Sequence, residues 1–294
     1  PVELELGAHY FGSAIFLDLN KKSGKKVLID IDKTNKYESG FYFPELLFPD
    51  KTPVFNNYIS GERVFKISSD IHKTDKLYLK KYNTDSILPA TPYYTSEDKA
   101  KFISEDTLFE YKKNDSIIPV EEGFYMISSD SSVSSGFAFY YHKSFYPWVR
   151  FPEDMLGPLR YICSRRDYKK IMEEKNLKLG IDKFWVNLAG SQKEAKELIR
   201  VYYNRVQLAN KYFTSEYPGW RTDRGMVYII FGAPHKVEKS GSKERWSYGE
   251  RENYPGIVFK FIRKEDALSK NSFEMIRDVR YKEAWTKAIK TWEG

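Results

Sequence analysis

The hydrophobic pattern of the chain changes period near residue 150, and this change constrains the fold more than any other feature. Before it, short segments rich in β-branched and aromatic residues are separated by glycine, asparagine and serine; they are residues 14–19, 26–31, 63–67, 76–80, 107–111 and 123–127. Several short strands at this spacing are typical of a β-sandwich. We therefore predict an all-β, Ig-like sandwich over residues 1–150, joined to the rest of the chain by the aromatic segment 146–152.

The pattern after residue 150 is helical at first. Residues 164–176 form a charged helix candidate, and residues 181–188 form a shorter one. Ser191 followed by Glu194 is a capping box and predicts the start of a long helix. Its apolar positions recur at helical spacing as far as Phe213, and Pro218 with Gly219 ends the segment.

Strand-like segments then return. Residues 226–231, 244–248 and 257–262 are predicted strands, and residues 281–292 are a predicted terminal amphipathic helix. This order of elements predicts an α+β domain over residues 151–294, in which packed helices cover a small antiparallel sheet.

Composition disfavours several classes of function. The net charge is −2 up to residue 150 and +9 after it, yet the densest basic cluster, residues 165–170, lies beside acidic residues as on a solvated helix, so nucleic-acid binding is not expected. The four histidines are scattered, and Cys163 is the single cysteine, which we interpret as a small core residue. No metal site, cofactor site, nucleophile elbow or phosphate-binding loop is expected.

The run of residues 219–232, Gly-Trp-Arg-Thr-Asp-Arg-Gly-Met-Val-Tyr-Ile-Ile-Phe-Gly, gathers the polar groups of a candidate site between glycines. In a structural interpretation, Asp223 accepts backbone N–H groups of the turn, and Arg224 pairs with a carboxylate or with carbonyl groups. In a functional interpretation, Trp220, Thr222, Asp223 and Arg224 surround a pocket for a carboxylate, a phosphate or a peptide backbone. A third interpretation makes Asp223 a catalytic carboxylate.

The long helix contributes two further candidates. Asn204 and Arg205 flank Val206, which belongs to the buried stripe, so both lie at the edge of that stripe. We therefore expect Asn204 and Arg205 to contact the Asp223 turn.

With these residues in view, the second half of the chain resembles the GWxTD domain, a bacterial family named for the residues that stand here as 219–223. The resemblance covers about residues 180–264. Beyond the five residues of the name, the positions that carry it are residues 184–185, 203–206, 209–210, 213, 224–225, 228–229, 232–234, 246 and 248. One departure is His235, which stands where the family often has an acidic residue. Trp246, from the aromatic strand of the family, completes a set of candidate binding residues with Trp220, Thr222, Asp223, Arg224, Asn204 and Arg205.

The resemblance implies an exported protein of a Gram-negative envelope, in the periplasm or at the outer-membrane surface, with no established catalytic activity. We expect a non-enzymatic binding module whose partner is an envelope or outer-membrane protein. Attachment to the membrane is expected only through an N-terminal lipid anchor preceding Pro1. The alternative is an enzyme that acts on peptidoglycan or a polysaccharide, with Asp223 and either Glu238 or Glu244 as paired carboxylates.

Overall fold

A computed structural model describes the C-terminal half of the chain almost completely, over residues 145–249, 256–265 and 268–292. Before residue 145 it describes the backbone of residues 9–18, 23–32 and 43–46, together with residues 56–61, 64–68, 76–84, 88–95, 103–112, 115–117, 119, 121–132 and 136–143. The described residues form a mixed α/β structure with several sheets and six α-helices.

The first half of the chain is built of strands, as its pattern predicts. β1 (His9–Asp18) pairs with β2 (Ser23–Asp32), and β3 (Phe43–Leu46) pairs with β5 (Phe65–Ser68), both antiparallel. A five-stranded sheet has the order β4-β9-β8-β6-β7, with strands at Tyr58–Ser60, Phe137–His142, Gly123–Ser128, Lys76–Thr84 and Ile103–Lys112. Each of the six predicted strand segments overlaps a strand of this structure.

One face of the five-stranded sheet is buried against β5. The rings of Phe65 in β5 and Phe139 in β9 meet edge to face with their centroids 5.5 Å apart. Leu79 of β6 and Ile127 of β8 pack in the same cluster and are almost completely buried. Aromatic and branched side chains at alternate positions of adjacent strands therefore form a compact core for this part of the chain.

The second half of the chain contains the helices and a second sheet. The helices are α1 (Pro152–Leu159), α2 (Arg165–Glu173), α3 (Leu177–Ala189), α4 (Gln192–Phe213), α5 (Asp223–Phe231) and α6 (Tyr281–Lys290). The antiparallel sheet has the order β10-β11-β12-β13, with strands at Lys236–Ser240, Lys243–Tyr248, Ile257–Arg263 and Phe273–Met275. The predicted helices and the strands at 244–248 and 257–262 are confirmed.

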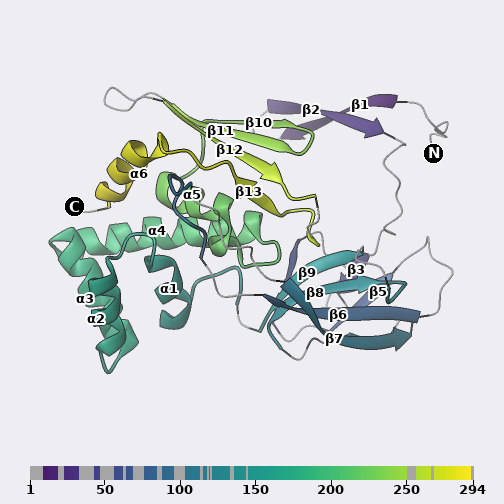
Figure 1. Ribbon diagram of the computed structural model, residues 1–294, viewed down its shortest axis with the longest axis horizontal. Helices are drawn as coiled ribbons and strands as arrows, with labels where there is room; N and C mark the ends of the chain where they lie inside the picture. Colours follow the sequence, from purple (N-terminus) through teal and green to yellow (C-terminus); the bar gives the residue numbers. More distant parts are fainter. Residues whose placement is uncertain are drawn as a thin grey trace.

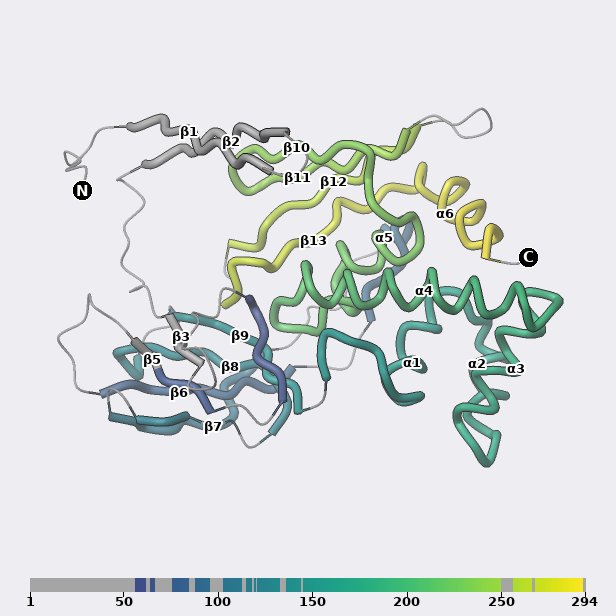
Figure 2. The backbone as a smooth tube through the Cα atoms, turned by 180° about the vertical axis from the view of Figure 1, so that it is seen from behind, coloured from purple at the N-terminus to yellow at the C-terminus, as the bar shows by residue number. Residues whose placement is uncertain are grey.

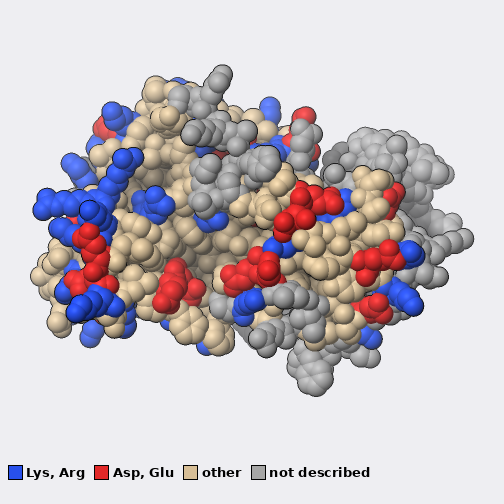
Figure 3. Space-filling model, turned by 60° about the horizontal axis from the view of Figure 1, so that its bottom comes forward, with Lys and Arg blue, Asp and Glu red and all other residues tan. Residues whose placement is uncertain are grey.

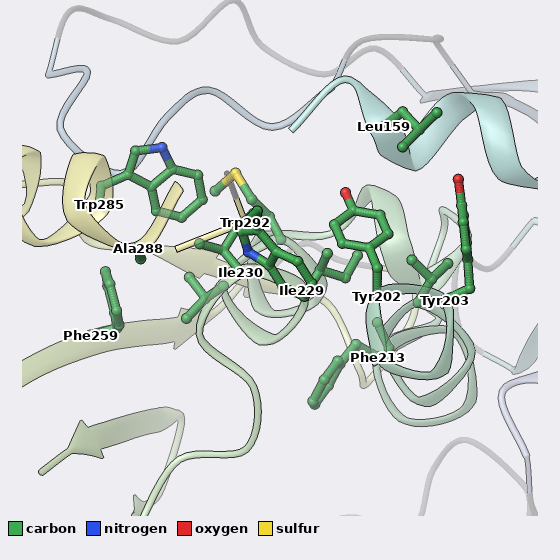
Figure 4. Packing of buried hydrophobic residues seen from close by; sticks show 14 of the residues in the cluster. Leu159, Tyr202, Tyr203, Phe213, Ile229, Ile230, Phe259, Trp285, Ala288 and Trp292 are labelled. Atoms are coloured by element: carbon green, nitrogen blue, oxygen red, sulfur yellow. The ribbon is translucent and has the colours of Figure 1, made fainter. Parts of the chain in front are cut away.

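These elements are arranged in layers (Figure 1). α4 and α5 lie against one face of the β10–β13 sheet, and α1, α2 and α3 lie on the far side of α4 (Figures 1 and 2). One cluster of buried aromatic and aliphatic side chains connects the layers; it includes Tyr202, Ile229, Ile230, Phe259 and Trp285 (Figure 4). Burial of this apolar surface is the main force that holds the helices on the sheet.

α4 begins where the sequence predicts. The Ser191 Oγ accepts a hydrogen bond from the backbone N–H of Glu194 at 3.2 Å, and the same hydroxyl donates to the Glu194 carboxylate at 2.6 Å. A serine in this position satisfies a backbone donor that the first helical turn would otherwise leave free.

The predicted strand at residues 226–231 is wrong, because this segment is the body of helix α5. Met226, Val227, Ile229 and Ile230 are buried, and Tyr228 and Phe231 are partly buried against the same core. Apolar residues thus occupy every face of this short helix, so its sequence carries no helical period. Periodicity cannot distinguish a short apolar strand from a short buried helix. The ends of the segment decide the structure: Thr222 caps the N-terminus, and Gly232 terminates the helix with a φ of 81° that favours glycine.

Candidate functional site

The polar residues of the 219–232 run form a tight turn that leads into α5. Gly219–Arg221 is a single turn of 3₁₀ helix, η1. The Thr222 hydroxyl donates to the carbonyl of Gly219 at 2.8 Å and accepts from the N–H of Gly225 at 3.0 Å. One hydroxyl therefore closes the turn and caps the helix.

Both glycines of the turn are required by close packing of the backbone. A Cβ atom on Gly219 would lie 2.0 Å from the carbonyl oxygen of Ala209 in α4. A Cβ atom on Gly225 would lie 1.9 Å from the carbonyl oxygen of Gly219. The turn is therefore pressed against α4 with no space for a side chain at either position.

Asp223 connects the turn to the end of the sheet. Its Oδ2 accepts from the backbone N–H of Met275 in β13 at 2.7 Å, and its Oδ1 accepts from Nη2 of Arg277 at 2.8 Å. The side chain is 3% exposed and lies in the first turn of α5, where the helix dipole favours a negative charge. Asp223 thus accepts a backbone N–H, as the structural interpretation expects, but from β13 and not from its own turn.

Arg224 lies on the other side of the helix start, in a buried ion pair. Its Nη1 lies 3.4 Å from both carboxylate oxygens of Glu244, and its Nη2 donates to the carbonyl of Asn271 at 2.6 Å. The guanidinium lies 4.0 Å from the ring centroid of Phe273. Burial lowers the pKa of Arg224 to about 10, while the charge of Glu244 acts in the opposite direction.

Trp246 belongs to the same buried cluster. Its indole N–H donates to Oε2 of Glu244 at 3.1 Å, and its ring packs against Phe213 and Phe261. Lys239 also contacts Glu244 at 3.2 Å. Glu244 therefore serves three donors, and Trp246 and Arg224 are held together inside the fold.

The expected contact between Asn204, Arg205 and the Asp223 turn is wrong. Arg205 reaches the opposite end of α5, where its Nη1 donates to the carbonyls of Ile229 and Ile230 at 3.1 and 2.8 Å. Asn204 is exposed. A helix edge meets several neighbours along its length, and the sequence does not specify which of them Arg205 contacts.

Asn210 makes the contact that was expected of Asn204 and Arg205. Its Oδ1 accepts from the N–H of Trp220 at 3.0 Å, and its Nδ2 donates to the carbonyl of Pro147 at 3.3 Å. Asn210 is buried. A polar residue four positions after Val206, within the apolar stripe of the helix, is the signal that could have identified it.

The turn also connects the two halves of the chain. The Tyr146 hydroxyl, from the junction after β9, is hydrogen-bonded to Thr214 and accepts from the N–H of Gly219 at 3.0 Å. Trp220 and Tyr146 line a small hollow of about 230 Å³ on this side, together with the exposed Trp148. The motif is therefore an internal joint between the strand-rich part and α4.

A larger cleft of about 890 Å³ opens on the other side of the motif, where Thr222 and Asp223 contribute to its floor. Tyr82 of β6 and Ile103 of β7 form the wall contributed by the first half of the chain. Leu268, which packs against the cluster that contains Tyr82, and Phe273 of β13 also line the cleft. The candidate residues are thus divided: two line the cleft, Trp220 lines the hollow, and Arg224 and Trp246 are enclosed.

The residues between α4 and the motif were not singled out from the sequence. Ser215, Glu216 and Tyr217 are all buried, and all three line the large cleft. The Oε1 of Glu216 accepts from the N–H of Ser269 at 2.9 Å. Polar residues before a Pro-Gly pair are typical of an exposed loop, so the sequence offered no signal that this loop is covered.

The paired carboxylates of the enzymatic alternative are engaged elsewhere. Both oxygens of Asp223 accept hydrogen bonds, Glu244 is buried with Arg224, and Glu238 pairs with Lys236 on β10. A general acid or base requires a carboxylate oxygen that can reach substrate.

Metal and thiol chemistry have no assembled site in the described part of the chain. No group of three or more His, Cys, Asp or Glu side chains is placed to hold a metal ion there. Cys163 packs beside the main core, and burial raises the pKa of its thiol to about 12.

Basic residues gather at the end of the molecule formed by α2 and α3, where acidic side chains lie among them (Figure 3). Lys169, Lys170 and Lys178 each pair with an acidic residue of their own helix. This is the solvated surface that the sequence predicts. Among the described residues, no helix is long and apolar enough to cross a membrane.

Comparison with known proteins gives one match. No curated protein and no solved structure matches the chain. A family model described as the GWxTD domain matches residues 123–294, from the start of β8 to the end of the chain. The match covers more than half of the sequence and includes the turn, α4, α5 and the β10–β13 sheet. The chain belongs to the GWxTD domain family.

Proposed function

We propose that this protein is a non-enzymatic binding module that takes a segment of a partner protein into the cleft beside the GWxTD turn. The observation that carries the proposal is the division of roles within the motif. Asp223 uses both carboxylate oxygens to hold β13 and Arg277, while the 890 Å³ cleft lies directly above it. The motif contributes to the floor of this recess, and its own carboxylate is already engaged.

The dimensions and lining of the cleft suit a peptide segment. Its volume lies within the range of about 300–1,000 Å³ that encloses a drug-sized ligand. Tyr82 and Phe273 supply apolar surface, and Ser215 and Ser272 supply hydroxyl groups that can bond to a peptide backbone. The cleft thus combines apolar surface with polar groups that can fix the orientation of a bound segment.

The envelope location is part of the proposal and rests on the family resemblance alone. We place the protein in the periplasm or at the outer-membrane surface of a Gram-negative bacterium, with an envelope or outer-membrane protein as its partner. The Ig-like sandwich belongs here too: the packing of Phe65 from β5 against the five-stranded sheet supports two facing sheets.

Site-specific photo-crosslinking tests the proposal. A benzophenone amino acid replaces Leu268 or Ile103 in the cleft walls, and Met172 on α2, which is 56% exposed, is the matched control. We expect the same partner adduct from Leu268 and Ile103 in envelope fractions, and none from Met172. Absence of an adduct from both cleft positions, or an identical adduct from Met172, refutes binding in the cleft.

A further inference from the structure

The large cleft lies where the two halves of the chain meet. The end of β13 approaches the strands of the first half (Figure 1), and the cleft is lined by β6, β7, residues 215–217 and residues 264–265, 268 and 272–274. The cleft therefore collects side chains that are distant in sequence, and their charges act together.

The charges that line the cleft are mostly negative. Four carboxylates, those of Glu216, Asp223, Glu265 and Glu274, face one lysine, Lys264. Asp223 is neutralised by Arg277, and Glu274 pairs with Lys264. Two carboxylates, those of Glu216 and Glu265, have no cationic partner among the residues that the structure describes.

Glu216 is the unusual member of this pair, because its side chain is 2% exposed. The backbone N–H of Ser269 bonds to its Oε1, and this bond satisfies one oxygen without neutralising the charge. Removing a carboxylate from water costs several kcal/mol unless a cation compensates it. In the described part of the chain, every other carboxylate buried to this degree has an arginine partner: Asp223 has Arg277, and Glu244 has Arg224.

We propose that the cleft recognises a basic side chain, lysine or arginine, of the partner polypeptide, and that Glu216 is its counter-ion. This inference rests on the proposed function and specifies its ligand. Ser215 and Ser272 also line the cleft, and their hydroxyls can accept remaining N–H donors of the ammonium or guanidinium group. Glu265, exposed at the rim, adds long-range attraction for the same charge.

The cleft is too large for a single free amine to fill. A volume of about 890 Å³ accommodates a basic side chain together with neighbouring residues of its chain. The apolar walls at Ile103 and Leu268 then contact those neighbours. The volume therefore favours a basic residue presented within a peptide over a small polyamine.

Binding of synthetic peptides tests the proposal directly. The probes are fluorescent hexapeptide pools, acetylated and amidated at their ends, in which one central position is arginine, lysine, citrulline or norleucine and the flanking positions are random. Anisotropy with the whole chain should show binding of the arginine and lysine pools about ten- to a hundredfold tighter than the citrulline and norleucine pools. This range corresponds to a hydrogen bond to a charged group, about 1.5–3 kcal/mol. Equal affinity for the arginine and citrulline pools overturns the proposal, and this comparison needs no variant.

The variant Glu216→Gln tests whether Glu216 is the source of the preference for the arginine and lysine pools. The amide can still accept from the N–H of Ser269, and we expect the variant to lose the preference for the basic pools. Glu238→Gln, on the surface of β10, is the matched control and should keep it. A preference that persists in a folded Glu216→Gln protein refutes the role of Glu216.

The two proposals fail in different ways. If the Glu216→Gln protein still forms the adduct at position 268 in undiminished yield, the binding function is supported and recognition of a basic side chain by Glu216 is refuted. If neither cleft position gives an adduct in the protein that keeps Glu216, the proposed binding function itself is refuted.

Discussion

Replacement of Asp223 by alanine is expected to destabilise the C-terminal part of the protein severely. The substitution leaves the buried N–H of Met275 without its Asp223 acceptor and removes the ion pair between Asp223 and Arg277. An orphaned buried donor costs about 1–3 kcal/mol, and removal of one partner of a buried ion pair costs about 3–5 kcal/mol. Because both penalties arise from one carboxylate they overlap, so we expect a total of about 3–5 kcal/mol.

Thermal melting followed by circular dichroism measures this loss. In a part of this size, about 1 kcal/mol corresponds to about 2–4 °C in Tm, so the expected decrease is about 6–20 °C. Asp182→Ala, which breaks an exposed pair with Lys178 within α3, is the matched control and should change stability by less than about 1 kcal/mol. A Tm of Asp223→Ala equal to that of wild type contradicts the structural role of this carboxylate.

Three further outcomes are expected. Gly219→Ala should lower the free energy of unfolding by at least about 1–3 kcal/mol, since its Cβ meets the carbonyl of Ala209, and urea denaturation with an unchanged midpoint would refute the close approach. Arg205→Lys should lower the free energy of unfolding by about 1–2 kcal/mol, because an ammonium group cannot both donate to the carbonyl of Ile230 and stack on the ring of Trp292. A double-mutant cycle with Trp292→Leu measures the coupling between the two side chains. Cys163 should react slowly with Ellman's reagent at pH 8 and faster as the pH rises toward its pKa of about 12, because the thiolate is the nucleophile. A rate equal to that of free cysteine at pH 8 would show that the thiol is not buried as described.

The sequence predicted the elements of the fold better than their contacts. The capped start of α4 and the strands β11 and β12 carry local signals, namely a capping box and alternating aromatic residues, and these signals are confirmed. α5 was missed because burial on all sides removes the period that distinguishes a helix from a strand.

The candidate site shows the same limit. Asp223 and Arg224 could be identified as a polar pair at a turn, but their partners Arg277 and Glu244 lie on distant segments. Glu216 and the covered loop around it have no local signal at all, because the contact that holds Glu216 comes from Ser269, 53 residues further along the chain. Contacts between segments distant in the chain depend on tertiary packing, which local sequence patterns do not encode.

The family match begins at Gly123, the first residue of β8, and β8 is hydrogen-bonded on one side to β9 and on the other to β6. The edge of the family match therefore runs through the middle of a sheet. The shared part and the preceding part complete one another's hydrogen-bond ladder, and the cleft takes its walls from both. We expect that the part before Gly123 could not be exchanged as a separate module, because β6 must keep its pairing with β8. A substitution at Tyr82 could still alter the lining of the cleft. In this chain the cleft therefore combines Thr222 and Asp223, which lie inside the family match, with Tyr82, which lies outside it.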